Sequence, residues 1–192
     1  LVADSLELVT SREEPFRSMK IAVWEDAGII EPSPAIKRAV REASEALVQA
    51  GHHVEFVQDE VAQDAAWVMF GLLSADGGRD IEHLFGDDKP IPGIAKLLRI
   101  GSLSRWIRPF LSAFMRIIGN RIDAAALKAT GPRSPKGFKE LLARREQIVK
   151  HMQNTAEEFD AIICPVSSLP ALQHGTAARL VAAASPCLLA NL

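Results

Sequence analysis

The sequence FDAIICPVSSLPALQHGTA, from Phe159 to Ala177, is the stretch that decides the fold. Its short apolar run, Ala161 to Cys164, is typical of a buried strand, and Pro165 ends the run because proline has no N–H to donate to a sheet. A loop of small hydroxyl side chains, prolines and a His-Gly pair follows. Because ligands in open α/β sheets bind outside the carboxyl ends of strands, this loop is a candidate for function. The alternative is a plain connection with satisfied polar groups.

A strand, a helix and a second strand are predicted upstream of this stretch. Lys20 to Trp24 is an apolar run, apolar residues recur at helical spacing from Ala35 to Val48, and His53 to Val57 alternates as a strand. Such a unit has a right-handed crossover, which predicts a parallel pair of strands. No glycine-rich phosphate fingerprint follows the first strand, and this disfavours a dinucleotide site.

Further helices are predicted along the chain. Val61 to Ser74 has helical spacing and ends at Asp76-Gly77-Gly78-Arg79, where the glycines indicate positive φ, a close approach of the backbone, or a plain turn. Ser134 and Pro135 are typical of the N-cap and first position of a long helix that runs to Phe159. Ala178 to Leu192 predicts an Ala-rich helix interrupted by Pro186, and Leu1 to Val9 has a short helical pattern.

The composition of the 192 residues is that of an ordinary globular chain, with 48% hydrophobic and 24% charged residues. Lys and Arg number 22 against 24 for Asp and Glu, so no charge excess indicates nucleic acid as a partner. Two cysteines, Cys164 and Cys187, are too few for a disulfide framework. We therefore expect a cytoplasmic location. Leu1 is no initiator methionine and Leu192 ends in mid-pattern, which predicts a segment of a longer protein.

The stretch from Leu97 to Ala126 combines an apolar face with arginines. Apolar residues follow at steps of three and one, and they are Leu103, Trp106, Ile107, Phe110, Leu111, Phe114, Ile117 and Ile118. Pro109 should kink or split this helical pattern. The arginines expected on the other side or at the flanks are Arg99, Arg105, Arg108, Arg116 and Arg121. Such a basic element favours a membrane surface, and the alternative is a surface helix on its own core.

Three groups of side chains are weak candidates for chemistry. Cys164 with His174 has the residue types of a thiol nucleophile and its base, but the thiol ends a strand before a proline. Ser167 and Ser168 could serve as hydrolase serines, yet no G-x-S-x-G elbow surrounds them. The five histidines show no metal-ligand spacing, and Asp87 with Asp88 is most simply a solvated loop. We expect no metal, no cofactor and no catalytic residue within the chain.

Five segments in a fixed order resemble the C-terminal half of the amidase signature family. They are Trp24 to Gly28, Pro32 to Val40, Ala50 to Val54, Ser74 to Arg79 and Asp160 to Gly175. The resemblance implies an α/β segment of the amidase signature fold, with a mixed sheet flanked by helices, in which residues 1–192 are the C-terminal part of one amidase domain. Residues 97–126 resemble the inserted membrane-binding cap of the fatty acid amide hydrolase branch.

The resemblance also implies a reaction. Members use a nucleophilic serine in a Gly-rich Ser-Ser loop, a bridging serine in a cis peptide, and a lysine base. None of these motifs stands in this sequence, so the catalytic residues are expected outside the chain and the segment alone should be inactive. The implied function is part of an amide hydrolase for apolar, fatty-acyl amides. The alternative is a catalytically inactive acyl-binding or membrane-docking module.

Two sets of residues are expected to serve this function. Val181, Ala184 and Leu188 share one face of the last predicted helix, and with Ile81 they are expected to line the acyl channel. Ordinary core packing is the alternative for that face. The cap set is Leu103, Trp106, Ile107, Phe110, Leu111 and Phe114. The expected partners are a small-molecule amide and a peripheral membrane surface, with a homo-oligomer left open.

Overall fold

The computed structural model describes residues 17–26, 28–57, 61–90, 92–177 and 180–192. Its elements are β1 (Lys20–Val23), α2 (Pro34–Gln49), β2 (His53–Phe56), α3 (Val61–Leu73), α4 (Arg79–Phe85), α5 (Pro92–Gly101), α6 (Arg108–Ile117), α7 (Arg121–Ala129), α8 (Pro135–Glu158), β3 (Ala161–Ile163) and the 3₁₀-helix η2 (Val181–Asn191). The helical patterns predicted for residues 1–9 and 178–179 lie outside the described residues.

The sheet has the order β2-β1-β3, and its strands are parallel. Lys20 is in register with His53 on one side, and Ile21 with Ala161 on the other. The central strand is buried, with Ala22 and Val23 both 0% exposed. The parallel pair predicted from the strand–helix–strand pattern is therefore confirmed, as is the α/β class. Where a mixed sheet was expected, the three described strands are all parallel.

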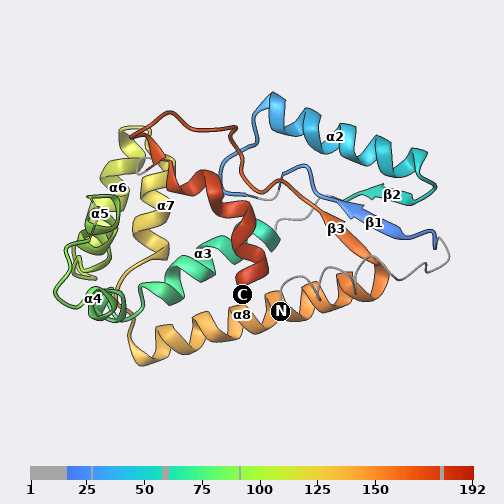
Figure 1. Ribbon diagram of the computed structural model, residues 1–192. Coiled ribbons are helices and arrows are strands. Elements are labelled where there is room, and N and C mark those ends of the chain that lie inside the picture. The colour runs from blue at the N-terminus through green and yellow to red at the C-terminus, as the bar shows by residue number, and fades with distance from the viewer. Residues whose placement is uncertain (1–16, 27, 58–60, 91, 178–179) are drawn as a thin grey trace.

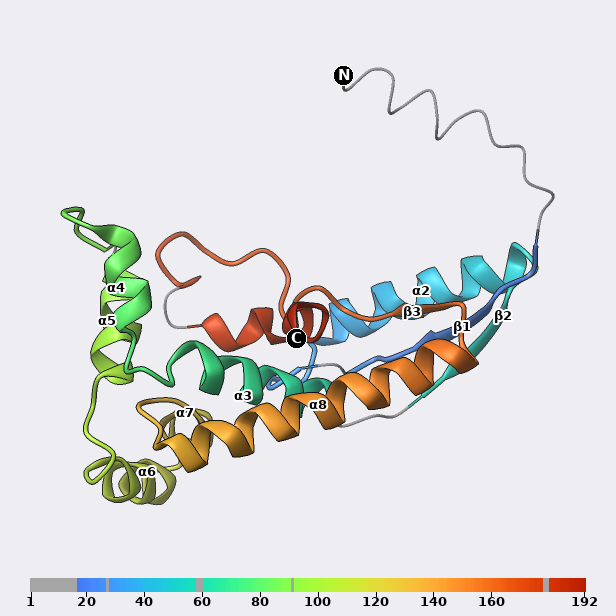
Figure 2. The same cartoon turned by 90° about the horizontal axis from the view of Figure 1, so that it is seen from below.

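Helices cover both faces of this sheet. Figure 1 shows α2 along one face and α8 along the other. Trp24, directly after β1, is 1% exposed and forms a core with Ala62 of α3. Met152 of α8 and Ile162 of β3 pack against this pair. In Figure 2, α3 and α8 run from the sheet towards α4, α5, α6 and α7, which gather at the opposite end of the molecule.

Local signals explain where the two best predicted helices begin. Ser134 Oγ accepts a hydrogen bond from the N–H of Gly137 at 3.2 Å, and Pro135 occupies the first turn of α8. Ser33 caps α2 in the same way, with its Oγ 3.4 Å from the nitrogen of Ile36. Each cap satisfies a backbone N–H that has no partner inside the helix and contributes about 1 kcal/mol.

The amphipathic stretch of residues 97–126 is divided among three helices. Residues 102–107 separate α5 from α6, and Gly119, at φ 86°, lies in the turn between α6 and α7. Pro109 occupies the first turn of α6, where its missing N–H has no helical partner to lose. The pattern is therefore split just before Pro109, which is one of the two predicted outcomes, and the proline begins a helix instead of kinking one.

The last element, η2, is a 3₁₀-helix that contains Pro186. With three residues per turn, side chains repeat at every third position. One face is buried or packs against the core and consists of Ala183, Pro186, Leu189 and Leu192. A second face, a third of a turn away, has the exposed residues Ala184, Cys187 and Ala190. The helix predicted here thus has a period of three, and it packs along α3.

Candidate functional site

Two loops and η2 meet beyond the carboxyl ends of β1 and β3. The N–H of Ser33 donates to the carbonyl of Ser168, and the N–H of Ser168 donates to the carbonyl of Ala183, both at 2.8 Å. The N–H of Ile29 donates to Ser185 Oγ at 2.8 Å. Ser168 and Ser185 are both 0% exposed. The loop after β3 therefore fixes η2 to the segment that leads into α2.

Gly28 allows this close approach. A Cβ at this position would lie 2.9 Å from both Pro186 Cγ and Ser185 Oγ, which is closer than van der Waals contact permits. The glycine of the Trp24 to Gly28 segment is thus required by packing against η2.

The hydroxyl, thiol and imidazole groups of the loop after β3 lie in unreactive surroundings. Ser167 Oγ donates to the carbonyl of Leu169 at 2.8 Å and closes a local turn. Ser168 Oγ is buried and has no hydrogen-bond partner among the described residues, so no base activates it there. His174 is exposed. Burial raises the pKa of the Cys164 thiol, and the nearby Cys187 raises it further, so the thiolate is disfavoured.

The Gly77-Gly78 turn holds the start of α4. Both glycines have positive φ, 86° and 90°, which confirms that part of the prediction. The carboxylate of Asp76 accepts hydrogen bonds from the N–H groups of Gly78 and Asp80, each at 2.7 Å. Burial acts to raise the pKa of Asp76, but these backbone donors outweigh it and the pKa is lowered. Ile81, in the next turn, is half-buried.

The predicted channel residues lie in two separate parts of the molecule. Val181 is the first residue of η2, and Ala184 lies on the exposed face of this 3₁₀-helix. Leu188 lies a third of a turn away and is half-buried. Ile81 belongs to α4, which Figures 1 and 2 place at the end opposite the sheet, away from η2.

The predicted cap residues divide into exposed and half-buried groups. Leu103 and Leu111 are half-buried. The exposed cap residues, with Ile117 of the same helix added, form what we call the α6 stripe, which starts just before α6. The exposed fractions are 73% for Trp106, 55% for Ile107, 79% for Phe110, 56% for Phe114 and 82% for Ile117. The other side of α6 packs on α7, where Ser112 Oγ donates to the carbonyl of Ala124 at 2.8 Å. Figure 2 shows α6 at the outer edge of the molecule.

The arginines near the cap do not all face outward. Arg105 is exposed and lies over the ring of Trp106 at 5.1 Å, and Arg99, Arg116 and Arg121 are exposed as well. Arg108, however, is only 6% exposed. The prediction that it joins the outward basic face is wrong, because its guanidinium is used inside the α5–α7 group.

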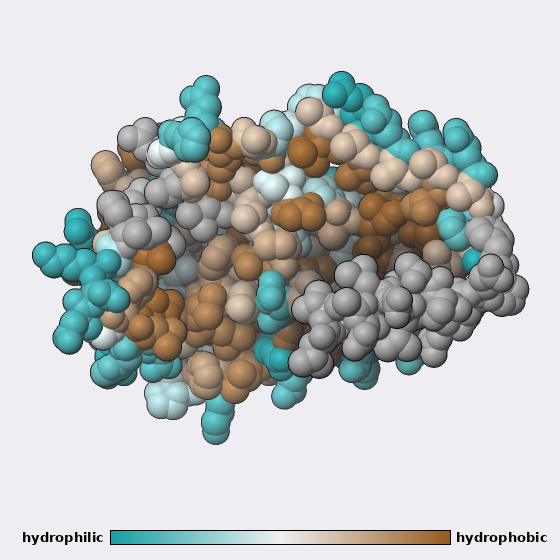
Figure 3. All heavy atoms as spheres, viewed as in Figure 1, coloured by the Kyte–Doolittle hydropathy of each residue, from teal (hydrophilic) through white to brown (hydrophobic). Residues whose placement is uncertain are grey.

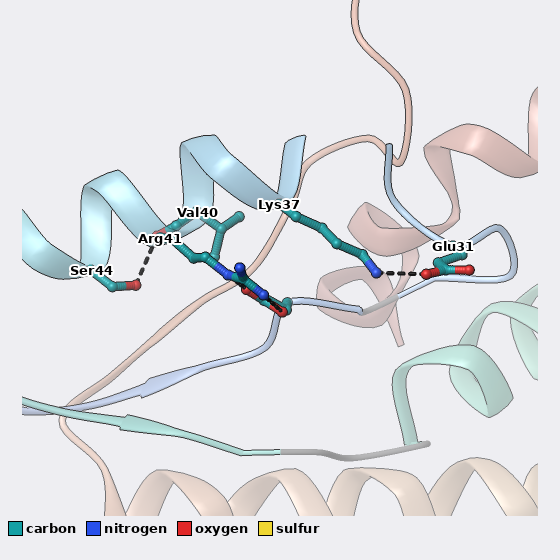
Figure 4. Close-up of polar contacts among 6 residues, drawn as sticks. Glu31, Lys37, Val40, Arg41 and Ser44 are labelled. Atoms are coloured by element: carbon teal, nitrogen blue, oxygen red, sulfur yellow. Dashed lines mark hydrogen bonds and ion pairs between the residues drawn. The ribbon is translucent and has the colours of Figure 1, made fainter. Parts of the chain in front are cut away.

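The basic side chains at the start of α2 are paired with acids. They line an open pocket of about 530 Å³. Lys37 contacts Glu31 at 2.6 Å, Arg41 pairs with Glu25, and Figure 4 shows the first of these contacts beside the helix. The hydrogen bond from Arg41 lowers the pKa of Glu25. These pairs leave little free positive charge for an anionic ligand.

A second open pocket, of about 420 Å³, lies between α3 and α8. Trp67 and His151 line it, and an ion pair joins Arg144 to Asp64 across it.

On the face seen in Figure 1, apolar residues gather over the sheet beside α2 and again towards the α4–α7 end (Figure 3). Within the described ranges, no three His, Cys, Asp or Glu side chains lie together as a metal site would need. None of the helices in the described part of the chain is both long and apolar enough to cross a membrane.

Comparison with known proteins identifies the class. The family model described as Amidase matches residues 3–192, and the chain belongs to this family. It is similar to the fatty acid amide hydrolase 1 of Caenorhabditis elegans, with 26% identity over 178 residues, which are 92% of this chain and 31% of that protein. It is 27% identical over 179 residues to the fatty-acid amide hydrolase 1 of Sus scrofa, covering 91% of this chain and 30% of that one. The chain thus spans about a third of these relatives, and the family resemblance is confirmed.

Proposed function

We propose that this chain is part of an amide hydrolase for apolar, fatty-acyl amides, in which α6 forms a membrane-docking cap and η2 contributes to the wall of the acyl channel. The observation that carries the proposal is the α6 stripe, an apolar surface left in solvent on a helix of an amidase. Two relatives named as fatty acid amide hydrolases support the substrate class.

The free energy of burying apolar side chains indicates that the α6 stripe has a binding partner. Burying a large apolar side chain contributes roughly 1.5–3 kcal/mol, and the stripe forgoes most of this at five positions. Contiguous exposed apolar patches mark surfaces that bind protein, ligand or membrane. The exposed Arg105, Arg116 and Arg121 flank the stripe, and each contributes about 1 kcal/mol near anionic lipid. A bilayer that also dissolves fatty-acyl amides is the partner that suits both the apolar and the basic groups.

The exposed face of η2 suits a channel wall. Ala184, Cys187 and Ala190 are small, so they leave space beside the helix for an alkyl chain. Leu189, one position from Leu188, packs against both core clusters and holds the helix on α3. Val181, Ala184, Leu188 and Ile81 are the residues we propose for the wall, with Ile81 at a separate position on α4.

We place the nucleophile and its base outside this chain. Ser167 is held in a turn and Ser168 is buried, and neither environment suits attack on an amide carbonyl. A fluorophosphonate probe, which labels activated serines, should therefore leave residues 1–192 unlabelled. Stoichiometric labelling of Ser167 or Ser168 that disappears in the matching Ser→Ala variant would contradict this assignment.

Hydrolysis assays of the full-length protein test the function itself. We expect release of amine from a long-chain fatty-acyl amide, with a kcat/KM higher than for the acetyl amide of the same amine. Comparing two acyl groups on one amine isolates the contribution of the channel. If the folded protein hydrolyses neither amide, the proposal is refuted.

A further inference from the structure

Arg108 makes an unusual set of contacts for a residue of an outer helix. Its side chain is 6% exposed and lies in the first turn of α6. Among the described residues, the guanidinium donates to five backbone carbonyls and one hydroxyl oxygen. The acceptors are the carbonyls of Leu103 (from Nε, 3.0 Å), Leu127 (from Nη1, 2.9 Å), Thr130 (from Nη1, 2.6 Å), Gly101 (from Nη2, 3.0 Å) and Ile100 (from Nη2), together with Thr130 Oγ1 (from Nη1, 3.2 Å).

All of the acceptors except Leu103, which lies between α5 and α6, are at the ends of two helices. Ile100 and Gly101 close α5, while Leu127 lies in the last turn of α7 and Thr130 caps it. The last carbonyls of a helix have no partner within it and form the negative end of its dipole. A planar guanidinium with five N–H donors can satisfy several such carbonyls at once. Burial lowers the pKa of Arg108, and the charge of Arg133 lowers it further, yet an arginine keeps its charge at neutral pH.

Gly131 makes room for the guanidinium. Its φ is +97°, and a Cβ there would overlap Cζ, Nε and Nη2 of Arg108. The N–H of Gly131 donates to Ser74 Oγ at 2.8 Å, which ties this segment to the residue that follows α3. The backbone after α7 is thus held between Arg108 and the end of α3.

We propose that Arg108 is a positioning residue that locks α6 onto the ends of α5 and α7 and thereby fixes the direction in which the α6 stripe faces before the cap meets a membrane. The α6 helix is ten residues long, and isolated helices of that length are marginal in water. The contacts of Arg108 are sufficient evidence for the lock, whereas its role in orienting the α6 stripe rests on the proposed function of the cap.

Amide hydrogen exchange of the full-length protein, without lipid, tests the lock. In the wild type, amides of α6 should exchange together with those in the last turns of α5 and α7. Arg108→Met should speed exchange of this group by about tenfold or more, because hydrogen bonds to a charged group are lost. Amides of β1 and α8 should keep their protection. Arg116→Met, which removes the same charge from the exposed side of α6, should match the wild type.

Arg108→Lys tests whether the planar guanidinium, and not merely a positive charge at this position, holds α6 in place. A lysine ammonium is a compact donor that cannot reach both helix ends with a planar fork, so this variant should resemble Arg108→Met. Wild-type exchange in Arg108→Lys, or in Arg108→Met, would overturn the proposal. If Arg108→Met fails to fold, Gly131→Ala is used to displace the guanidinium instead. Exchange in the wild type also tests the lock by itself. If the α6 amides of the wild type exchange independently of the ends of α5 and α7, the lock is refuted.

Binding to vesicles of phosphatidylserine and phosphatidylcholine separates this proposal from the cap. With the α6 stripe intact, Arg108→Met should bind more weakly than Arg145→Met, which removes an exposed arginine of α8, because its stripe no longer has one fixed orientation. Equal binding of the two variants would contradict the orienting role. If the wild type ignores vesicles while its exchange pattern is as expected, the membrane cap fails and the lock holds. If the wild type binds but the exchange pattern is absent, the lock fails and the cap holds.

Discussion

Single polar side chains define the loops of this molecule. Asp76 holds the Gly77-Gly78 turn with two backbone hydrogen bonds, and Ser185 holds the segment at Ile29 with one. Hydrogen bonds of this kind each contribute about 1 kcal/mol, and removing one partner leaves the other unsatisfied. Substitutions at these positions should therefore act on stability first.

Asp76→Ala should lower the free energy of unfolding by about 1–2 kcal/mol, because both N–H donors lose their acceptor. The pKa of Asp76 is lowered in the folded state from its ordinary value of 3.8, so folding favours the carboxylate. This stabilisation is present above that value and is lost as pH falls through the folded pKa. Urea unfolding at pH 7 should show the full difference from the wild type, and the difference should shrink in strong acid. Asp87→Ala, on the exposed 86–90 loop, is the control; a pH-independent difference would contradict the assignment.

Gly28→Ala should destabilise the fold by about 1–3 kcal/mol, because the new methyl group overlaps Pro186 and Ser185. Gly137→Ala is the matched control, since a Cβ there meets Ser134 Oγ at an ordinary 3.5 Å inside α8. Alanine is preferred over glycine within helices by up to about 1 kcal/mol, so this control should be neutral or stabilising. Thermal unfolding measures both, and equal shifts would show that the contact of Gly28 with η2 is unimportant.

At the scale of elements, the sequence predicts a helix or a strand well when the signal lies in the residues that form that element. Ser33 and Ser134 each accept a hydrogen bond from the residue three positions ahead, and β1 and β3 each end one residue before the predicted apolar run ends. Arg108 was misplaced because its acceptors lie up to 22 positions away. Helical spacing continued across residues 102–107, so the spacing did not reveal the break between α5 and α6, whereas Pro109 indicated a split close to it.

The helix predicted near the end of the chain is present as η2, but its side chains repeat every three residues instead of every 3.6. Apolar residues from 181 to 192 fit a helix of either kind, and the choice depends on contacts with α3 and Gly28 that the local sequence does not contain. The resulting faces repeat every three residues, so Leu188 is turned away from Ala184. The proposed wall is consequently strongest at Ala184.

Ala184→Trp should raise KM for long-chain amides much more than for short-chain ones, because the indole occupies space that only a long acyl group uses. Its position on the exposed face of η2 predicts little loss of stability. Ala143→Trp, on an exposed position of α8, should change neither KM. Steady-state kinetics of the full-length protein with two chain lengths provides the comparison. An equal rise for both amides would remove Ala184 from the channel.

At the scale of the whole molecule, two ends serve different purposes. The sheet end contains the loops that fix η2, and the other end gathers α4 to α7 with the α6 stripe at its rim (Figure 2). Helices α3 and α8 join the ends, and the core of Ala65, Val68 and Ile148 lies where they pack together. In our proposal an apolar amide passes from the bilayer, beside α6, towards the wall formed by η2.

The central claim is that the α6 stripe faces lipid, and co-sedimentation with anionic vesicles at low salt tests it most directly. The full-length wild type is compared with Trp106→Ser/Phe110→Ser/Phe114→Ser and with the control Phe138→Ser/Leu142→Ser, whose residues are exposed on α8. The triple variant should keep its cooperative thermal transition, because its side chains are already in solvent, and should lose most vesicle binding. The control should bind as the wild type does. Loss of the thermal transition in the triple variant, or a wild type that stays in the supernatant, would contradict the account.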